Sequence, residues 1–130
     1  MNRAALIAIT LFAVGTAHAA IDDPVQVDTG TISGTTTGSP EVRAFKGIPY
    51  ATPPVGDLRW RAPKPAAHWE GTRAADQFGP VCMQGGDQKM SEDCLYLNVW
   101  TGAKAVSEKR PVMVWIYGGG YNGGFRRRRS

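Results

Sequence analysis

The sequence predicts an α/β fold in which this chain supplies strands, turns and few helices. Residues 112–117 form an unbroken apolar run between Pro111 and Gly118. A strand without a polar face must be covered on both sides, as in the central sheet of an α/β protein. Several upstream segments alternate apolar and polar residues, the period of half-buried strands. The 130 residues include 16 glycines and 9 prolines, which indicates one turn-rich globular unit.

The N-terminus has the pattern of an export signal. Arg3 precedes an apolar run over residues 4–14, and Ala17-His18-Ala19 fits the small-x-small cleavage pattern. The apolar run is short for a bilayer core of about 30 Å, which disfavours the alternative of a retained anchor. We expect a signal peptide over residues 1–19, cleavage after Ala19, and a secreted or periplasmic protein without a stable membrane anchor.

The net charge of +4 comes from the chain ends. Arg3 and the four arginines of residues 126–129 are five of the 15 basic residues, so ten remain in the body against 11 acidic residues. A near-neutral body offers no basic face to a phosphate backbone. We therefore expect no nucleic-acid partner.

The first strands are expected soon after the signal peptide. Residues 25–29 alternate apolar and polar side chains, Gly30 allows a turn, and residues 31–33 can return as a hairpin partner. Residues 34–40 are a predicted loop, and residues 42–48 the next strand.

A proline-rich segment follows. Residues 49–65 contain five prolines, which predicts an extended, irregular path pinned to a core by Trp60 and Trp69. Residues 72–78 are expected to form at most one short helical turn. Residues 95–100 alternate and predict another strand.

Cys82 and Cys94 are the two cysteines of the chain. An even number in an exported protein suggests one bridge, here across a short loop; two free buried thiols are the alternative. A metal site is disfavoured because the spacing does not suit paired CxxC motifs and His68 is the one nearby imidazole. We expect no metal.

Three glycines, Gly118-Gly119-Gly120, follow the apolar run at its carboxyl end, where ligand sites form in open α/β sheets. Gly118-x-Gly120-x-x-Gly123 formally matches a dinucleotide fingerprint, but its acidic partner would lie about 20 residues on, beyond residue 130. The backbone N–H groups could instead form an oxyanion hole, or the segment could be a flexible turn. The residues alone favour the oxyanion interpretation only slightly.

Four long motifs decide between these interpretations. They are Phe45–Ala51, Pro53–Trp60, Ser91–Val99 and Pro111–Gly120. In order and spacing they resemble the N-terminal portion of type B carboxylesterases, in the α/β-hydrolase superfamily, over about residues 25–124. The resemblance implies the N-terminal part of an α/β-hydrolase fold, with a β-hairpin, an irregular proline-rich segment and the first strands of the central sheet. It also implies a secreted serine hydrolase that acts on small-molecule carboxylic esters through an acyl-enzyme and needs no cofactor.

The resemblance also assigns roles to residues. Gly119 and Gly120 would supply the oxyanion-hole N–H groups. Cys82 and Cys94 would form the family's first disulfide. Arg59 would pair with Glu92 in a structural salt bridge, the alternative being two solvated charges of little energetic value.

The disulfide loop also bears on the substrate. In the cholinesterase branch the family's first disulfide encloses a longer loop with a cation-binding tryptophan. Here residues 83–93 contain no aromatic side chain, which argues against choline esters.

The sequence contains no Gly-x-Ser-x-Gly, and no Asp, Glu or His follows Gly120. In this fold the nucleophile, acid and histidine all follow the oxyanion glycines. His68 precedes the sheet and is expected to be a surface or packing residue.

We therefore expect residues 20–125 to be the N-terminal portion of a carboxylesterase type B domain, inactive alone. An atypical basic tail at residues 126–130 would reflect truncation or a frame change near Phe125, or else a genuine basic contact segment. The alternative function is an exported, non-catalytic binding module on the same scaffold.

Removal of the export signal can be tested directly. Material recovered from the extracytoplasmic fraction should begin at Ala20, as measured by intact-mass spectrometry, because the cleavage pattern ends at Ala19. Recovery there of a chain that still begins at Met1 would contradict the assignment.

Overall fold

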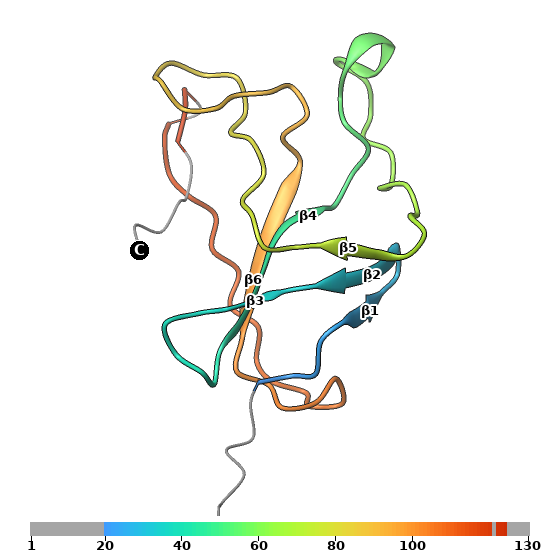
Figure 1. The fold of residues 1–130 in the computed structure, drawn as a ribbon. Helices are drawn as coiled ribbons and strands as arrows, with labels where there is room; N and C mark the ends of the chain where they lie inside the picture. Colours follow the sequence, from blue (N-terminus) through green and yellow to red (C-terminus); the bar gives the residue numbers. More distant parts are fainter. Residues whose placement is uncertain (1–19, 121, 125–130) are drawn as a thin grey trace, which may run out of the picture.

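A computed structural model describes residues 20–120 and 122–124 and shows two small sheets (Figure 1). The first sheet has the order β1-β2-β5, from β1 (Val25–Val27), β2 (Gly30–Ser33) and β5 (Thr72–Ala74). The second has the order β3-β4-β6, from β3 (Thr35–Thr36), β4 (Arg43–Pro49) and β6 (Tyr96–Thr101). The expected signal peptide at residues 1–19, the tail at 126–130 and Phe125 lie outside the described residues.

Helical structure is scarce in this part of the chain. A 3-10 turn, η1 (Gly56–Leu58), is the helical element among the described residues. Residues 20–120 and 122–124 contain no helix that is long and apolar enough to cross a membrane. The predicted irregular path of the proline-rich segment is confirmed, since η1 alone interrupts it.

The predicted N-terminal hairpin is confirmed. Strands β1 and β2 pair antiparallel, with Val25 opposite Ile32 and Val27 opposite Gly30. Strand β5 then joins the free side of β2 in parallel. Residues 72–78, expected to form at most one short helical turn, form none, and the strand at residues 72–74 was not predicted. Residues 72–74 complete the backbone hydrogen bonding of β2, and a three-residue strand is too short to show a readable period in the sequence.

The long strand β4 is confirmed close to its predicted bounds, and so is the strand β6. The two strands pair antiparallel. The register between them shifts between Phe45 and Ile48. Gly47 sits in this irregularity with φ of 67° and donates its N–H to Asn98 Oδ1 at 2.9 Å. A Cβ at Gly47 would lie 2.6 Å from the carbonyl oxygen of Gln77. Glycine is thus required both by the backbone conformation and by the space.

The core lies where the hairpin meets β4. Ile21, Ile32, Phe45 and Ala75 form its buried cluster. Partly buried apolar side chains pack around it, namely Val25, Val27, Ile48 and Trp69. The predicted pinning role of Trp69 is confirmed, because its indole Nε1–H donates to the carbonyl of Thr31 at 2.9 Å. Trp60 does not share this role: its side chain is 96% exposed.

Asp23 ties the two sheets together. One carboxylate oxygen accepts the Ser33 hydroxyl and the other accepts the Gly34 N–H, both at 2.8 Å. The guanidinium of Arg43, at the start of β4, lies 3.5 Å away. These side chains are mostly buried, at 16% and 19% exposure for the ion pair, so each bond is screened less than a surface contact. The short β3, inside the predicted loop at 34–40, begins directly after this junction.

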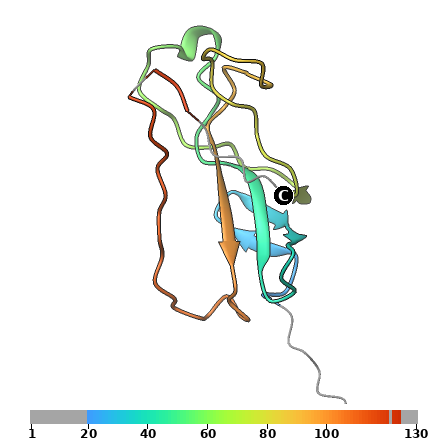
Figure 2. The ribbon, with the colours of Figure 1, turned by 90° about the vertical axis from the view of Figure 1, so that its left-hand side faces the viewer.

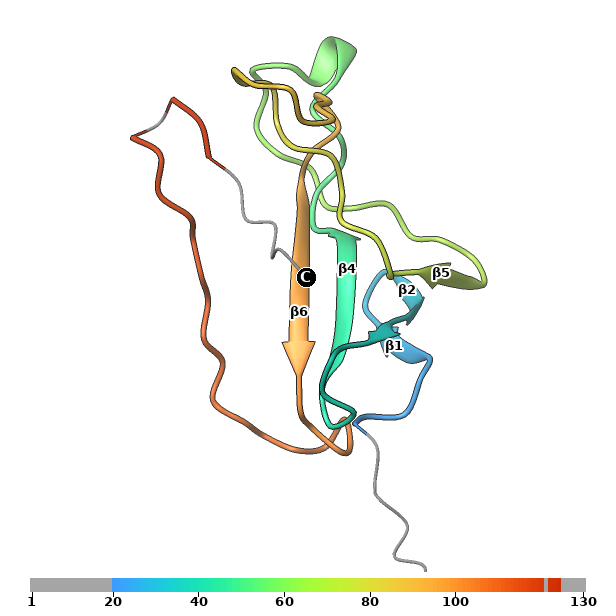
Figure 3. The ribbon, with the colours of Figure 1, turned by 60° about the vertical axis from the view of Figure 1, so that its left-hand side comes forward.

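The apolar run at residues 112–117 differs from its prediction. It forms no strand in the structure, and its side chains are between 45% and 92% exposed. Figures 2 and 3 show residues 105–120 running past β6 without joining its sheet. The prediction of a central strand is wrong for the described chain, because such a strand must be covered on both apolar faces and these side chains are left largely exposed.

The core assignment predicts unequal effects of two aromatic truncations. Phe45→Ala should lower the free energy of unfolding by about 3 kcal/mol, because Phe45 is 4% exposed and its removal leaves a cavity. Trp60→Ala should change that free energy by less than about 0.5 kcal/mol, as expected for an exposed side chain. Urea unfolding followed by far-ultraviolet circular dichroism measures both. Equal losses in the two variants would contradict the assignment.

Candidate active site

A short covalent loop organises the candidate site. Cys82 and Cys94 are joined by a disulfide, with their Cα atoms 5.1 Å apart, and we call residues 82–94 the disulfide loop. Backbone hydrogen bonds close the same loop, from Val81 N–H to the Lys89 carbonyl at 3.0 Å and from Ser91 N–H to the Val81 carbonyl at 2.9 Å. The loop is therefore held at its base by two independent kinds of bond.

The disulfide loop holds the start of β6. Asp93 accepts a hydrogen bond from the Tyr96 hydroxyl at 2.9 Å. Burial raises the pKa of Tyr96 above its ordinary value, and this hydrogen bond to Asp93 raises it further. The raised pKa keeps the Tyr96 hydroxyl protonated, and able to donate to Asp93, up to a higher pH than an ordinary tyrosine would allow.

The pair assigned to a salt bridge also involves the disulfide loop. Arg59 Nε lies 3.0 Å from Glu92 Oε1, which links the residue after η1 to the disulfide loop. The side chains are 55% and 41% exposed, so the pair contributes between 0 and about 1 kcal/mol. Solvent screening at this exposure leaves the pair little contribution to stability.

The two glycines assigned to an oxyanion hole lie in a turn near the C-terminal end of the described chain. We call residues 118–120 and 122–124 the glycine turn. Asn122 N–H donates to the Gly119 carbonyl at 3.1 Å. Gly120 has φ of 58°, a conformation that favours glycine. Both Gly119 and Gly120 are exposed, so their backbone is accessible to a small molecule.

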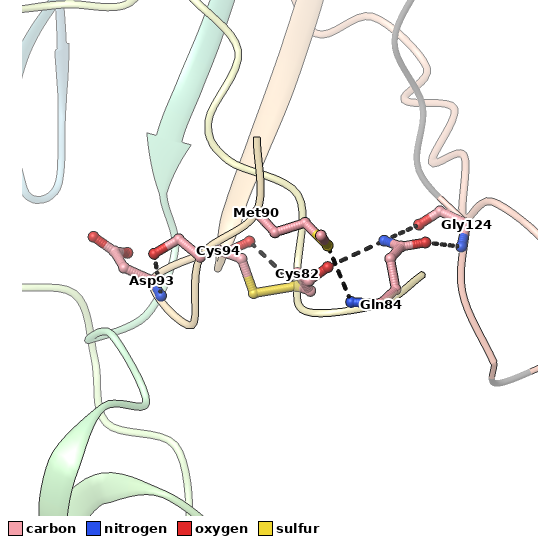
Figure 4. Close-up of a disulfide and its surroundings, with 7 residues drawn as sticks. Cys82, Gln84, Met90, Asp93, Cys94 and Gly124 are labelled. Carbon is pink, nitrogen blue, oxygen red and sulfur yellow. Dashed lines mark hydrogen bonds between the residues drawn. A yellow bond between two sulfur atoms is a disulfide. The ribbon is translucent and has the colours of Figure 1, made fainter. Parts of the chain in front are cut away.

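Gln84 connects the disulfide loop to the glycine turn (Figure 4). Its side-chain Oε1 accepts the Gly124 N–H at 2.7 Å. Its Nε2 donates to the carbonyls of Gly124, at 3.3 Å, and of Cys82, at 3.2 Å. The two segments are 40 residues apart in the chain, and this side chain brings them together.

The sequence analysis did not identify Gln84. No periodicity marks a single side chain that bonds to backbone groups so far along the chain. Its position two residues after Cys82, inside a short bridged loop, is the signal that could have drawn attention to it. His68, expected on the surface or in packing, is exposed. Within the described ranges no group of three or more His, Cys, Asp or Glu side chains could hold a metal ion.

Comparisons with known proteins agree on one family. Residues 22–128 match the model of the carboxylesterase family. The chain is similar to fumonisin B1 esterase of Sphingopyxis macrogoltabida, with 46% identity over 79% of this chain and 20% of that protein. It is also similar to phenmedipham hydrolase of Pseudarthrobacter oxydans, with 49% identity over 58% of this chain and 18% of that protein.

Solved structures give the same result. A carboxylesterase of Geobacillus stearothermophilus superimposes with a TM-score of 0.74 at 44% identity, covering 79% of this chain and 21% of that one. The chain therefore spans about a fifth of the length of the relatives it matches.

Breaking the disulfide should loosen this arrangement. Cys94→Ser should make Cys82 alkylatable in the native protein and lower the free energy of unfolding by about 3 kcal/mol, the chain-entropy value for a loop of this size. Iodoacetamide labelling with mass spectrometry, and urea unfolding, measure the two effects. Full labelling of both cysteines in unreduced exported wild-type protein would rule out the bridge.

Proposed function

The chain belongs to the carboxylesterase family, and from this membership we propose that the whole protein is a secreted serine carboxylic-ester hydrolase. In this proposal the chain supplies the oxyanion donors, the backbone N–H groups of Gly119 and Gly120. A serine nucleophile, a histidine base and an acidic residue complete such a site, and they follow the oxyanion glycines in this fold. The proposal places all three outside these 130 residues.

The glycine turn is the observation that carries the proposal. It is exposed, it follows the apolar run directly, and it is anchored to a disulfide-closed loop through Gln84. Donors that are fixed before the reaction stabilise a developing charge without reorganising. A flexible glycine turn without such an anchor would not hold its N–H donors in place before the reaction.

The chemistry then proceeds in two displacements. The serine Oγ attacks the ester carbonyl carbon as the histidine takes the hydroxyl proton, and the carbonyl oxygen becomes an oxyanion that Gly119 and Gly120 stabilise. The C–O bond breaks, the alcohol leaves with that proton, and an acyl-enzyme remains. Water, activated by the same histidine, attacks the acyl carbon and releases the acid.

The substrate class proposed is a small-molecule carboxylic ester. Fumonisin B1 esterase and phenmedipham hydrolase, by their names, act on small organic molecules. The absence of aromatic side chains from residues 83–93 disfavours recognition of a quaternary ammonium group, which aromatic faces bind best. Choline esters are therefore not the proposed substrates.

Export is part of the same proposal. A disulfide persists in an oxidising compartment and is rare in the cytosol, and the chain has one between Cys82 and Cys94. The leader pattern at residues 1–19 agrees with that location. The proposed compartment is thus outside the cytoplasm.

The proposal is tested on the whole protein and on this chain separately. The whole protein should hydrolyse p-nitrophenyl acetate and incorporate one serine-reactive phosphonate per molecule, whereas residues 20–130 alone should show the buffer rate and no label. Gly119→Pro in the whole protein removes one N–H donor and also distorts the glycine turn, because Gly119 has a positive φ and no room for a Cβ, so it should lower kcat by about 100-fold or more. Stoichiometric labelling of residues 20–130 alone, or no ester hydrolysis by the whole protein, would overturn the proposal.

A further inference from the structure

We propose that Gln84 is a positioning residue that fixes the oxyanion glycines by clamping the backbone of Gly124. The contact between Gln84 and Gly124 is a feature of this chain, and its catalytic consequence rests on the function proposed above. No catalytic role is implied for Gln84 itself, because it acts through the turn and not on the substrate.

The clamp has two points of opposite polarity. Gln84 Oε1 accepts from Gly124 N–H at 2.7 Å, and Gln84 Nε2 donates to the Gly124 carbonyl at 3.3 Å. Two bonds to one peptide residue fix both its distance and its orientation, much as a neighbouring strand would. A carboxamide is suited to this because it carries a donor and an acceptor side by side.

The end of the clamp in the disulfide loop is held firmly. Gln84 Nε2 also donates to the Cys82 carbonyl at 3.2 Å, and the Gln84 N–H donates to Met90 Sδ at 3.4 Å. Figure 4 shows these bonds next to the disulfide. The side chain of Gln84 therefore extends from a covalently closed loop, which limits how far the clamp can move.

The end of the clamp at the glycine turn transmits that constraint to the oxyanion glycines. A Cβ built on Gly124 would collide with the carbonyl oxygen of Gly118, and one built on Gly119 would collide with that of Gly123. The two arms of the glycine turn are thus in close backbone contact. In the proposal, a displacement of Gly124 therefore shifts Gly118 and Gly119 as well.

Such a displacement matters because oxyanion donors act over a short range. They must lie about 2.7–3.1 Å from the developing charge, and a misplacement of about 1 Å costs on the order of 100-fold in rate. Loss of the clamp should therefore reduce kcat, which reports the chemical step, more than KM.

The chain offers a matched control. Gln88 lies in the same loop, and its Nε2 donates to the carbonyl of Gly85 at 3.0 Å, a contact within the loop. Gln84→Met and Gln88→Met remove the same chemical group from the same loop at similar side-chain size. Only the first removes the bond to Gly124. Gln84→Glu keeps an acceptor for the Gly124 N–H and loses the amide donor.

The experiment uses the whole protein and two readouts. Hydrogen exchange with mass spectrometry follows the peptide that spans the glycine turn. In Gln84→Met the Gly124 amide should exchange about 10-fold faster or more, in Gln84→Glu it should stay closer to wild type, and in Gln88→Met it should be unchanged. Per active site titrated with phosphonate, kcat should fall at least about 10-fold in Gln84→Met, with KM within about twofold.

Unchanged exchange in Gln84→Met, or equal effects of Gln84→Met and Gln88→Met, would overturn the clamp. An unchanged kcat per titrated site would overturn its positioning role. If the wild-type whole protein hydrolyses no ester, the proposed function fails, and the exchange rates still decide whether Gln84 holds Gly124.

Discussion

The covalent closure between Cys82 and Cys94 is the constraint on which the candidate site depends. Three side chains reach out of the loop that it closes, each to a different part of the chain. Glu92 pairs with Arg59 after η1, Asp93 accepts from Tyr96 at the start of β6, and Gln84 bonds to Gly124. Without the bridge, each of these placements would have to offset more conformational entropy, since fixing the backbone of each residue costs about 1–2 kcal/mol. By closing the loop, the disulfide lowers that cost for all three contacts.

The sequence predicted the parts of the fold that depend on local pattern. The hairpin, β4 and β6 were predictable because the pattern of apolar and polar residues and the turn residues lie within each segment. Strand β5 was missed, since its three residues owe their conformation to the free edge of β2. The run at residues 112–117 was predicted as a strand from its composition, yet a strand also needs backbone pairing, and the run does not pair with the free edge of β6. In the site, the motifs located Gly119 and Gly120, whereas the clamp at Gln84 depends on a contact across 40 residues.

The core of the described chain is small, as expected for a chain that spans about a fifth of the length of its relatives. Five of the nine buried apolar residues are alanines, and no large side chain in the described ranges is fully buried. Meanwhile Val112, Met113 and Ile116 are each more than 80% exposed. A chain that spans about a fifth of its relatives contributes the strand-rich N-terminal region of the α/β-hydrolase fold. Small units of this kind bury too little apolar surface to be robust on their own.

The first residues of the described chain carry a practical consequence for handling the protein. Ala20 and Ile21 are 7% and 8% exposed, and the Ile21 N–H donates to the carbonyl of Ala103 at 2.6 Å. Asp23 then joins the two sheets only two residues later. An affinity tag fused directly before Ala20 would begin at a point where the backbone is already enclosed by its neighbours. Purification handles for this protein therefore belong on a flexible linker, where the added chain can leave the surface without disturbing Ile21 or Asp23.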